Sequence, residues 1–360
     1  GLGTDRDVRG AGIMMSDEHI RLMRPGDAAL LAEFLKMGYG RGPARESTLN
    51  GLLRAADLYR WLAPLWWLLE KTGAFSALLP RFYVVLYGNR MAAIQGIARK
   101  CRLQGDRSIW NITHLVVHPD YRRQGVSTRL FAHILKTLSP GSSVTGKSNP
   151  GESNHGNELT ILTKIRNANT AQIRNREKTG FHHYGSLNTY AWERGRSQLQ
   201  HLWGLLPLDR ETPAYRFDPA VPGSAVTRLK ALETPPATAA IDPTLLHASK
   251  KSLNPAEKIC WRLILSPCWQ EGIWHGTDLL AWALLAYNRL QKTYLLELCG
   301  RPGHTQALTA LLARADAYLA AHRRATVYIP VCDFQETVNT VMYQSGLPAM
   351  DTHVLYHRSV

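Results

Sequence analysis

The sequence predicts an α+β fold in which a mixed, mostly antiparallel sheet is flanked by helices and the chain is divided into two lobes. Two apolar runs, Arg81–Tyr87 and Met91–Leu103, flank the turn residues Gly88-Asn89-Arg90, a pattern typical of a β-hairpin. Strand and helix signals then alternate, which indicates a βαβ crossover beside the hairpin. The 360 residues exceed one ordinary domain, so two domains are expected.

Apolar periodicity predicts each element of the first lobe. In chain order, the expected elements are a strand at Ile20–Pro25, helices at Gly26–Met37 and Leu52–Glu70, strands at Arg81–Tyr87, Met91–Leu103 and Trp110–Val117, a helix at Ser127–Leu138, a strand at Leu159–Ile165, a helix at Thr170–Lys178 and a strand at Phe181–Glu193. The intervening stretch Ser139–Asn157 is rich in Gly, Ser and Asn, and therefore predicts a loop.

The second half of the chain partly repeats this order. Its expected elements are strands at Asp278–Tyr287 and Thr293–Cys299, a helix at Thr305–His322, a strand at Thr326–Val331, a helix at Gln335–Gln344 and a strand at Thr352–His357. An internal duplication is therefore a hypothesis. We expect an added N-terminal extension at 1–15, lobes at 16–195 and 237–360, and a proline-rich linker region at 196–236.

The composition restricts the class of protein. The net charge of +15 fits nucleic acid, an anionic membrane surface or an anionic cofactor, but the basic residues form no tail, so we favour a basic enzyme over nucleic-acid recognition. The five scattered cysteines predict free thiols in a reducing cytoplasm and no metal site. No apolar run reaches the roughly 18 residues of a membrane span. The Trp-rich Leu58–Leu69 predicts packing, with an acyl or acceptor pocket or weak membrane-surface contact as alternatives.

The strongest functional signal is the stretch Leu115–Ser127, in which an apolar strand ends, a basic turn follows and a helix begins at or near Ser127. A helix N-terminus leaves N–H groups without partners and attracts phosphate. Gly125 lets the backbone approach an anion closely, Arg122 and Arg123 add charge, and Ser127 suits an N-cap. Taken alone, the stretch also fits a solvated basic loop before an ordinary helix.

The turn Arg122-Arg123-Gln124-Gly125-Val126-Ser127 resembles the acetyl-CoA signature Arg/Gln-x-x-Gly-x-Gly/Ala of the GNAT (GCN5-related N-acetyltransferase) superfamily. Asn169–Phe181 is similar to that family's Asn…Tyr-x-x-x-Gly-Phe helix and follows at the expected spacing. The resemblance covers roughly Ile20–Glu193 and implies a GNAT-like fold, acetyl-CoA or another acyl-CoA as co-substrate, and no metal. The residues it implies for acyl-CoA binding are Leu115, Val116, Val117, Arg122, Arg123, Gln124, Gly125, Val126, Ser127, Thr128 and Asn169.

The catalytic groups are less well specified. Arg176 stands where the family has a tyrosine thought to protonate the leaving thiolate. Arginine is a poor general acid, although it could stabilise a thiolate or contact a CoA phosphate. The resemblance implies the Val117 amide as the donor to the thioester oxygen. Alternation would place Thr113 on the face of Leu115 and Val117, and His114 on the other. His114 is the candidate base, but a histidine packed under a helix fits equally well.

Two further stretches of the sequence bear on this assignment. The turn Arg301–Thr305 of the second lobe is short and contains Pro302, which removes an amide, and Tyr343 lies one residue from the tyrosine position. We therefore interpret the second lobe as a degenerate GNAT-like domain. Gly141–Ser148 matches the phosphate-loop pattern GxxxxGK[ST], but a helix precedes it and Asn149-Pro150 follows, so an accidental match is expected.

The sequence thus favours an N-acyltransferase that moves an acetyl or other acyl group from acyl-CoA to an amine of a small molecule or peptide. One alternative is a non-catalytic acyl-CoA-binding or regulatory protein, which the loss of the tyrosine favours. Others are a GNAT-like enzyme with altered chemistry, such as decarboxylation or transfer to a carrier protein, and a nucleic-acid-modifying enzyme. The acceptor, the acyl chain length and the oligomeric state stay open.

Overall fold

The computed structural model describes most of the chain. The described residues are 18–38, 43–61, 64, 81–88, 90–102, 108–138, 159–192, 215–246, 264–322 and 326–360. The expected extension at 1–15, the loop Ser139–Asn157 with its phosphate-loop match, and most of the Trp-rich segment lie outside them. We call residues 18–192 the first half and residues 215–360 the second half.

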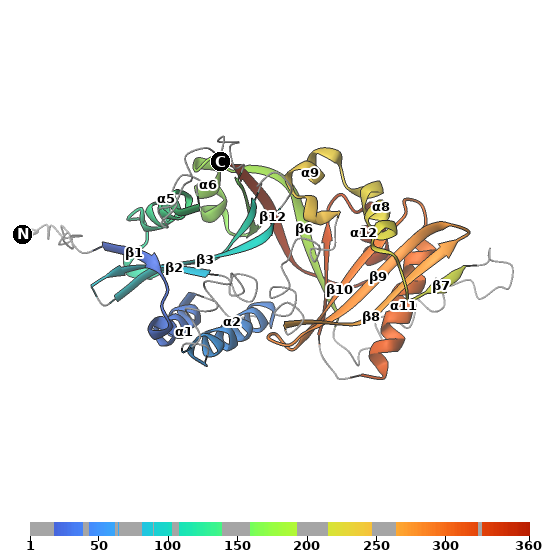
Figure 1. Ribbon diagram of the computed structural model, residues 1–360, viewed down its shortest axis with the longest axis horizontal. Helices are drawn as coiled ribbons and strands as arrows, with labels where there is room; N and C mark the ends of the chain where they lie inside the picture. Colours follow the sequence, from blue (N-terminus) through green and yellow to red (C-terminus); the bar gives the residue numbers. More distant parts are fainter. Residues whose placement is uncertain are drawn as a thin grey trace, which may run out of the picture.

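The described strands form a single sheet of 12 strands (Figure 1), in the order β1-β2-β3-β4-β5-β12-β6-β11-β10-β9-β8-β7. Their bounds are β1 Glu18–Leu22, β2 Arg81–Tyr87, β3 Arg90–Arg102, β4 Ser108–Val117, β5 Leu159–Arg166, β6 His182–Trp192, β7 Arg216–Asp218, β8 Leu265–His275, β9 Asp278–Asn288, β10 Thr293–Gly300, β11 Val327–Cys332 and β12 Ala349–Ser359. Among the described pairs, β4–β5 and β10–β11 are parallel and the others are antiparallel. The expected mixed, mostly antiparallel α+β fold is confirmed.

Helices cover both faces of this sheet (Figure 1). Their bounds are α1 Ala28–Gly38, α2 Pro43–Trp61, α5 Val126–Leu138, α6 Thr170–Lys178, α8 Gly223–Glu233, α9 Pro236–Ile241, α11 Thr305–Ala320 and α12 Glu336–Gln344. In β2, Phe82 and Val84 pack against the helices α1 and α2, whereas Tyr83 and Val85 pack on the side of α5. The strand is buried on both faces, which explains why its sequence is continuously apolar. None of the described helices combines the length and hydrophobicity that crossing a bilayer requires.

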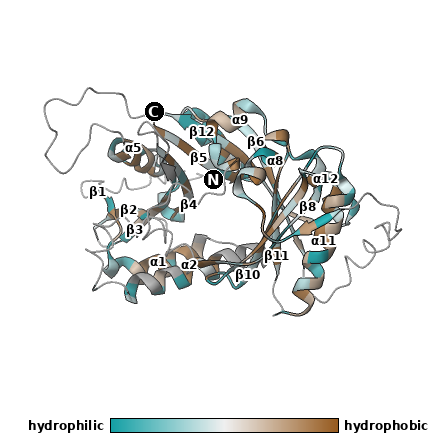
Figure 2. Cartoon of the chain, turned by 45° about the vertical axis from the view of Figure 1, so that its right-hand side comes forward, coloured by the Kyte–Doolittle hydropathy of each residue, from teal (hydrophilic) through white to brown (hydrophobic). Residues whose placement is uncertain are grey.

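The helix α5 shows how the sequence produces this packing. Val126, Leu130, Phe131 and Ile134 recur at the spacing that places them on one side of a helix, and all four are buried. Figure 2 shows the hydrophobic residues of α5 beside the strands that it covers. Burial of each large side chain stabilises the fold by roughly 1.5–3 kcal/mol, so the helix is fixed on the sheet mainly by this stripe.

The last strand of each half lies within the other half. β12 is inserted between β5 and β6, and β6 lies between β12 and β11. Reading the strand order from either edge toward the middle therefore gives the same arrangement, with five strands of one half followed by the final strand of the other. The exchange joins the two halves through continuous backbone hydrogen bonding rather than through side-chain contact alone.

The exchange follows an internal twofold relation. Leu187 and His353 pair at the middle of the β6–β12 ladder and are 166 positions apart in the sequence. The same offset relates the pair Leu187–Cys332 of β6–β11 to the pair His353–Arg166 of β12–β5. It also relates α6 to α12, residue for residue. This agreement of register supports the hypothesis of an internal duplication.

Several elements of the second half were missed. β8 was not predicted, and β7, α8 and α9 lie in or at the end of the segment expected to be a linker. The prolines that suggested a connection sit at helix starts, since Pro222 and Pro235 occupy the N-cap positions of α8 and α9. A proline is compatible with the beginning of a helix because no intrahelical N–H bond is lost there. The boundaries at 195 and 237 stay predictions.

Because the sheet is continuous, replacing Leu308 by Ala should destabilise both halves together. Leu308 of α11 is fully buried in the core of the second half, so its truncation should lower the free energy of unfolding by about 2–5 kcal/mol. Hydrogen exchange of peptides from β4 and β5 should speed up as much as that of β10. Leu232→Ala, at a largely exposed position, serves as the control. Unchanged protection of β4 and β5 would show that the halves unfold independently.

Candidate functional site

The site begins where β4 and β5 separate. The parallel pairing runs from Ser108–Leu159 to Ile112–Thr163 and then stops, although β4 continues to Val117. The rest of β5 pairs on its other side with β12, as far as Arg166 opposite His353. Beyond Ile112 the two parallel strands therefore leave backbone groups of β4 unpaired by β5.

A β-bulge in β4 lies directly after this point. His114 has a positive φ of 52°, and the pairing with β3 shifts register between Ile94 and Gly96. Such a conformation is uncommon for a residue other than glycine, and a bulge leaves one residue of the strand without a partner. The equivalent pairing of β10 with β9 runs without a shift. The irregularity thus belongs to the first half and not to the fold in general.

The bulge corrects the predicted orientation of Thr113. The Thr113 hydroxyl lies close to Gly96 and Phe82, and the His114 ring is 6.3 Å from the Phe82 ring. Both side chains therefore lie on the side of α1 and α2, whereas Leu115 and Val117 pack on the side of α5. Strict alternation would have placed Thr113 with Leu115, but the extra residue at His114 interrupts it.

The register directs the Val117 amide into the space between the separated strands. The backbone N–H of His118 donates to the Ala92 carbonyl of β3 at 2.9 Å, so the ladder assigns His118 to a hydrogen-bonded pair. Val117, one residue earlier, therefore points its backbone groups away from β3. Its carbonyl accepts a hydrogen bond from Arg122 Nε at 3.3 Å, in agreement with this direction.

The basic turn leads into α5. Arg123 and Gly125 both have positive φ, 62° and 75°, and the Gly125 carbonyl accepts the first helical hydrogen bonds from Thr128 and Arg129 at 3.0 Å. Gly125 therefore occupies the N-cap, and Ser127 is the second residue of the helix rather than its cap. The exposed residues of this stretch are Arg122, Arg123, Gln124, Gly125 and Thr128, whereas Val126 is buried and Ser127 and Val116 are not exposed.

An ion pair that the sequence did not reveal holds the turn in place. Arg129 donates to the Glu18 carboxylate at 3.0 Å, to the Tyr87 hydroxyl at 2.9 Å and to the Gln124 carbonyl at 2.8 Å. The Tyr87 ring also stacks on Tyr121, with 5.0 Å between centroids. The turn is thereby anchored to β1 and β2. An arginine four residues after a glycine carries no local signal for this contact, since Glu18 is distant in sequence.

The structure brings the two signature segments together. Asn175 of α6 contacts Ser127 of α5 through their side chains at 3.4 Å. Asn169 is exposed and caps α6, where its Oδ1 accepts the Gln172 N–H at 3.2 Å. Both helix N-termini therefore border the region in which β4 and β5 separate.

Arg176 is almost entirely buried, with 1% of its surface exposed. Its guanidinium lies 4.8 Å from the centre of the Phe131 ring and 5.5 Å from that of Phe181. Within the described part of the chain, its Nε and Nη2 atoms have no hydrogen-bond partner. Desolvation lowers the pKa of Arg176 to about 10, so the group stays cationic at neutral pH. Met342 of α12 occupies the equivalent position in the second half, which shows that the fold accepts an apolar side chain there.

In the second half, contacts between β10 and α12 fill the space that is equivalent to the candidate site. Gln335, the N-cap of α12, donates from its side chain to the Leu298 carbonyl of β10 at 3.4 Å. A Cβ added to Gly300 at the end of β10 would lie 3.0 Å from the Thr337 side chain of α12. Strand and helix thus meet directly, and the connecting turn Arg301–His304 holds a single arginine. These contacts agree with the interpretation of this half as degenerate.

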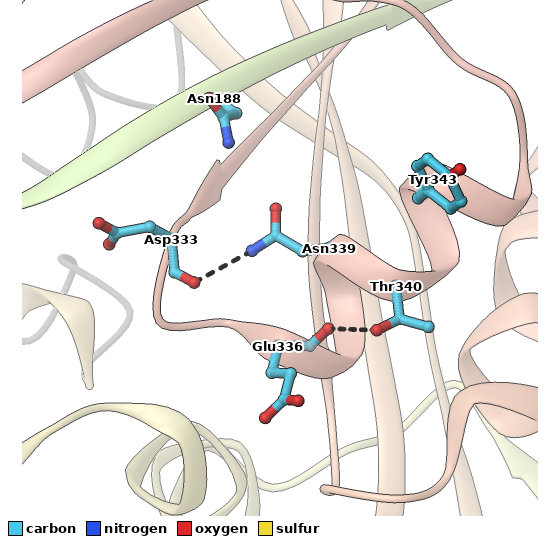
Figure 3. Close-up of a pocket in the computed structure, with 6 residues that line it drawn as sticks. All are labelled: Asn188, Asp333, Glu336, Asn339, Thr340 and Tyr343. Atoms are coloured by element: carbon cyan, nitrogen blue, oxygen red, sulfur yellow. Dashed lines mark hydrogen bonds between the residues drawn. The ribbon is translucent and has the colours of Figure 1, made fainter.

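A hollow of about 430 Å³ lies elsewhere in the second half, between β6 and α12 (Figure 3). Its lining residues are Asn188, Asp333, Glu336, Asn339, Thr340 and Tyr343. The Asn339 amide donates to the carbonyls of Cys332 and Gln335, and the Asp333 carboxylate accepts the Ser186 N–H at 2.9 Å. These hydrogen bonds hold the start of α12 and the turn before it against β11 and the exchanged strand β6. We therefore assign the hollow no catalytic role.

Comparison with known proteins agrees with this geometry. Residues 48–140 match the sequence profile described as "Acetyltransferase (GNAT) family". A GCN5-related N-acetyltransferase from Sphaerobacter thermophilus shares 14% identity and a TM-score of 0.54, with 95% of each chain covered. A tandem GNAT protein from the clavulanic acid biosynthesis pathway shares 13% identity and a TM-score of 0.54, with 95% of this chain and 98% of that chain covered. No curated protein sequence matches the chain.

The burial of His114 predicts a pH dependence of stability. Desolvation, and then the charge of Lys164, lower the pKa of His114 from 6.5 to about 4. The unfolded chain therefore binds a proton more readily, and this contribution to stability is lost as pH falls from about 6.5 to 4. His114→Asn should reduce the loss by up to about 3 kcal/mol, because asparagine tolerates the positive φ and carries no proton.

Thermal unfolding at pH 7.5 and pH 4.5 checks this expectation. His275→Asn, at an exposed position of β8, should keep the loss of stability seen in the unaltered chain. An equally steep loss in His114→Asn would mean that His114 is protonated in the folded protein.

Proposed function

We propose that this chain belongs to the GNAT superfamily, as the family match over residues 48–140 and the fold support. We propose further that it is an N-acyltransferase that uses acetyl-CoA or another acyl-CoA and an amine acceptor. The observation that carries the proposal is the separation of β4 from β5, with the Val117 amide directed into it and the start of α5 beside it. We further propose that the protein acts in the cytoplasm, on a small molecule or peptide, without nucleic acid or metal.

The turn before α5 supplies the phosphate site in this proposal. Gly125 is at the N-cap, and within the described part of the chain the Val126 and Ser127 amides have no backbone acceptor. The exposed Arg122 and Arg123 add positive charge. Gly125 tolerates its positive φ because it has no side chain. For the same reason its backbone can approach the anion closely. Gln124, Val126, Ser127 and Thr128 complete the same turn, and Asn169 borders the path of the pantetheine arm.

The thioester would lie between β4 and β5, with Leu115, Val116 and Val117 along one side. A backbone N–H that is already fixed in place stabilises the oxyanion of a tetrahedral intermediate without reorganisation. The Val117 amide is such a donor, since its direction is set by the ladder to β3. The acceptor amine would attack from the side of Thr113 and His114 and form the C–N bond of the tetrahedral intermediate. The C–S bond would then break, and the nitrogen would release its proton to water.

His114 is neutral at physiological pH because of its low pKa. It can accept a hydrogen bond from an incoming amine, but a group with this pKa is a weak base. The amine must therefore reach the thioester already neutral, or lose its proton to water. The Thr113 hydroxyl, buried without a hydrogen-bond partner among the described residues, is a second polar group at this point.

Arg176 takes the place of the family's tyrosine in this scheme. A cation held between two aromatic rings, with two nitrogens unsatisfied, stabilises negative charge strongly because the surroundings screen it weakly. We assign it the stabilisation of the leaving thiolate, which water then protonates. Burying an unpaired charge costs stability, and such a cost is consistent with a functional role.

A second candidate function is acyl-CoA binding without catalysis. The low pKa of His114 and the absence of a tyrosine at position 176 favour it, since neither a base near neutral pH nor a phenol acid is present there. It predicts that acyl-CoA binds and that no amine accelerates the release of CoA. Calorimetry with acetyl-, malonyl- and long-chain acyl-CoA, followed by a thiol-release assay with an amine panel, separates the two functions.

Replacing Gly125 by Glu should abolish acyl-CoA binding. The side chain would add negative charge where the phosphates are expected and would strain the positive φ. We expect the Kd to rise at least about 100-fold in calorimetry, since charge repulsion and lost amides act together. Gly303→Glu is the matched control, because Gly303 also has a positive φ, in the equivalent turn of the second half. Equal affinity in both variants contradicts the assignment of the phosphate site.

Replacing Arg176 by Met should separate catalysis from stability. The methionine of the second half fits this position, and removal of an unpaired buried charge should raise the free energy of unfolding by roughly 1–4 kcal/mol. We expect acyl-CoA affinity to change little and kcat to fall about 10- to 100-fold. Arg174→Met, at an exposed position of the same helix, is the control. A variant that is more stable and equally active would make Arg176 a packing residue.

A further inference from the structure

Lys164 lies at the point where β4 and β5 separate. It follows Thr163, the last residue of β5 that pairs with β4. Its neighbours Ile161 and Ile165 are buried on the side of α5, so Lys164 lies on the opposite side of the sheet. Thr113 and His114 lie on that same side, and the Lys164 charge acts on the His114 imidazole. Lys164 also keeps solvent-exposed surface.

The groups around Lys164 leave an excess of positive charge. Arg166 pairs with Asp351 at 2.7 Å, and Lys100 pairs with the buried Asp242 at 2.5 Å. The two carboxylates are thus already engaged. Within the described part of the chain, Lys164 has no ion pair. Desolvation and then the charge of Lys100 lower its pKa, while the Asp351 carboxylate acts in the opposite direction. His353, also on this side, is a further group that proton binding would make positive.

The fold does not require these charges. The positions related to them by the internal twofold hold no ionised side chain. The counterparts of Lys164, Arg166, Asp351 and His353 are Pro330, Cys332, Gly185 and Leu187, respectively. Among the described residues, the charged cluster therefore lies beside β4, which carries the bulge. It has no equivalent beside β10 and β11, which also stop pairing beyond Leu295 and Tyr328. This coincidence connects the cluster with the open site rather than with the stability of the sheet.

We propose that the acceptor carries an anionic group, a carboxylate or a phosphate, and that Lys164 binds this group beside the reacting amine. The inference rests on the proposed acyltransferase function, because it specifies the acceptor of that reaction. An amine without an anionic group would, when protonated, meet repulsion from Lys164, whose charge has no ion-pair partner among the described residues. An anionic group on the same molecule offsets this repulsion. The positive surroundings also favour the neutral form of the amine, which is the form that attacks the thioester.

Two matched pairs of amines test the preference with the full chain and acetyl-CoA. β-Alanine is compared with β-alaninamide, and phosphoethanolamine with ethanolamine, so each pair differs in one anionic group. We expect kcat/KM to be at least about tenfold higher for the anionic member of one pair, and the pair that responds identifies the anion. Lys164→Gln should abolish the preference and Lys164→Arg should keep it. Lys36→Gln, at an exposed position of α1, is the control.

A second readout decides the proposal even if no amine of the panel is acylated. Labelling of lysines by an amine-reactive ester is measured by mass spectrometry with and without β-alanine, phosphoethanolamine or inorganic phosphate. We expect protection of Lys164 and none of Lys36, with or without acetyl-CoA. The proposal is overturned if no anion protects Lys164, or if Lys164→Gln keeps the preference for an anionic amine. Failure of acetyl-CoA to bind would instead contradict the proposed function, while the labelling result still stands.

Discussion

The backbone pairing of β12 with β5 is the constraint on which the rest of the structure depends. Backbone N–H and C=O groups of a buried strand must be paired, and β12 pairs with those on one edge of β5 from Thr160 to Arg166, which holds β5 in the sheet beyond its last contact with β4. β4 pairs with β5 for a shorter distance and is then free to bend away. The separation that forms the site in the first half is therefore maintained by a strand of the second half. The exchange is part of the site as well as a link between the halves.

Two halves with the same arrangement of strands differ around equivalent strand ends. In the second half a regular β10, a short turn and a side chain of α12 close the space between strand and helix. In the first half β4 carries a bulge, the turn before α5 is longer and more basic, and a buried arginine, Arg176, lies against Phe131 of α5. The differences lie in a few residues at the ends of strands, where packing constrains the sequence least. A sheet of this size thus tolerates a functional irregularity in one place because regular pairing surrounds it.

The sequence predicted the local features of this fold better than the distant ones. Most elements from β1 to β6, the two signature segments and the short turn of the second half follow from periodicity, turn residues and a family resemblance. The helix α2 is an exception, since it begins at Pro43 and not at the expected Leu52. The bulge at His114 could not be predicted, because one extra residue in a strand leaves the apolar pattern almost unchanged. The N-cap at Gly125, the anchor between Arg129 and Glu18, and the burial of Arg176 depend on contacts between distant residues. The strand exchange likewise cannot be predicted from the sequence, since the apolar pattern of β6 does not specify which strand it pairs with.

The position of β12 in the chain also affects how the protein is made. β5 begins at Leu159 and its partner β12 begins at Ala349, about 190 residues later. At a synthesis rate of about 5–20 residues per second, the ribosome needs roughly 10–40 s to deliver this partner. During that interval the edge of β5 is unpaired and open to pairing with other chains. A nascent chain of this protein therefore depends on protection of that edge, whether by a chaperone or by transient pairing with its own β6.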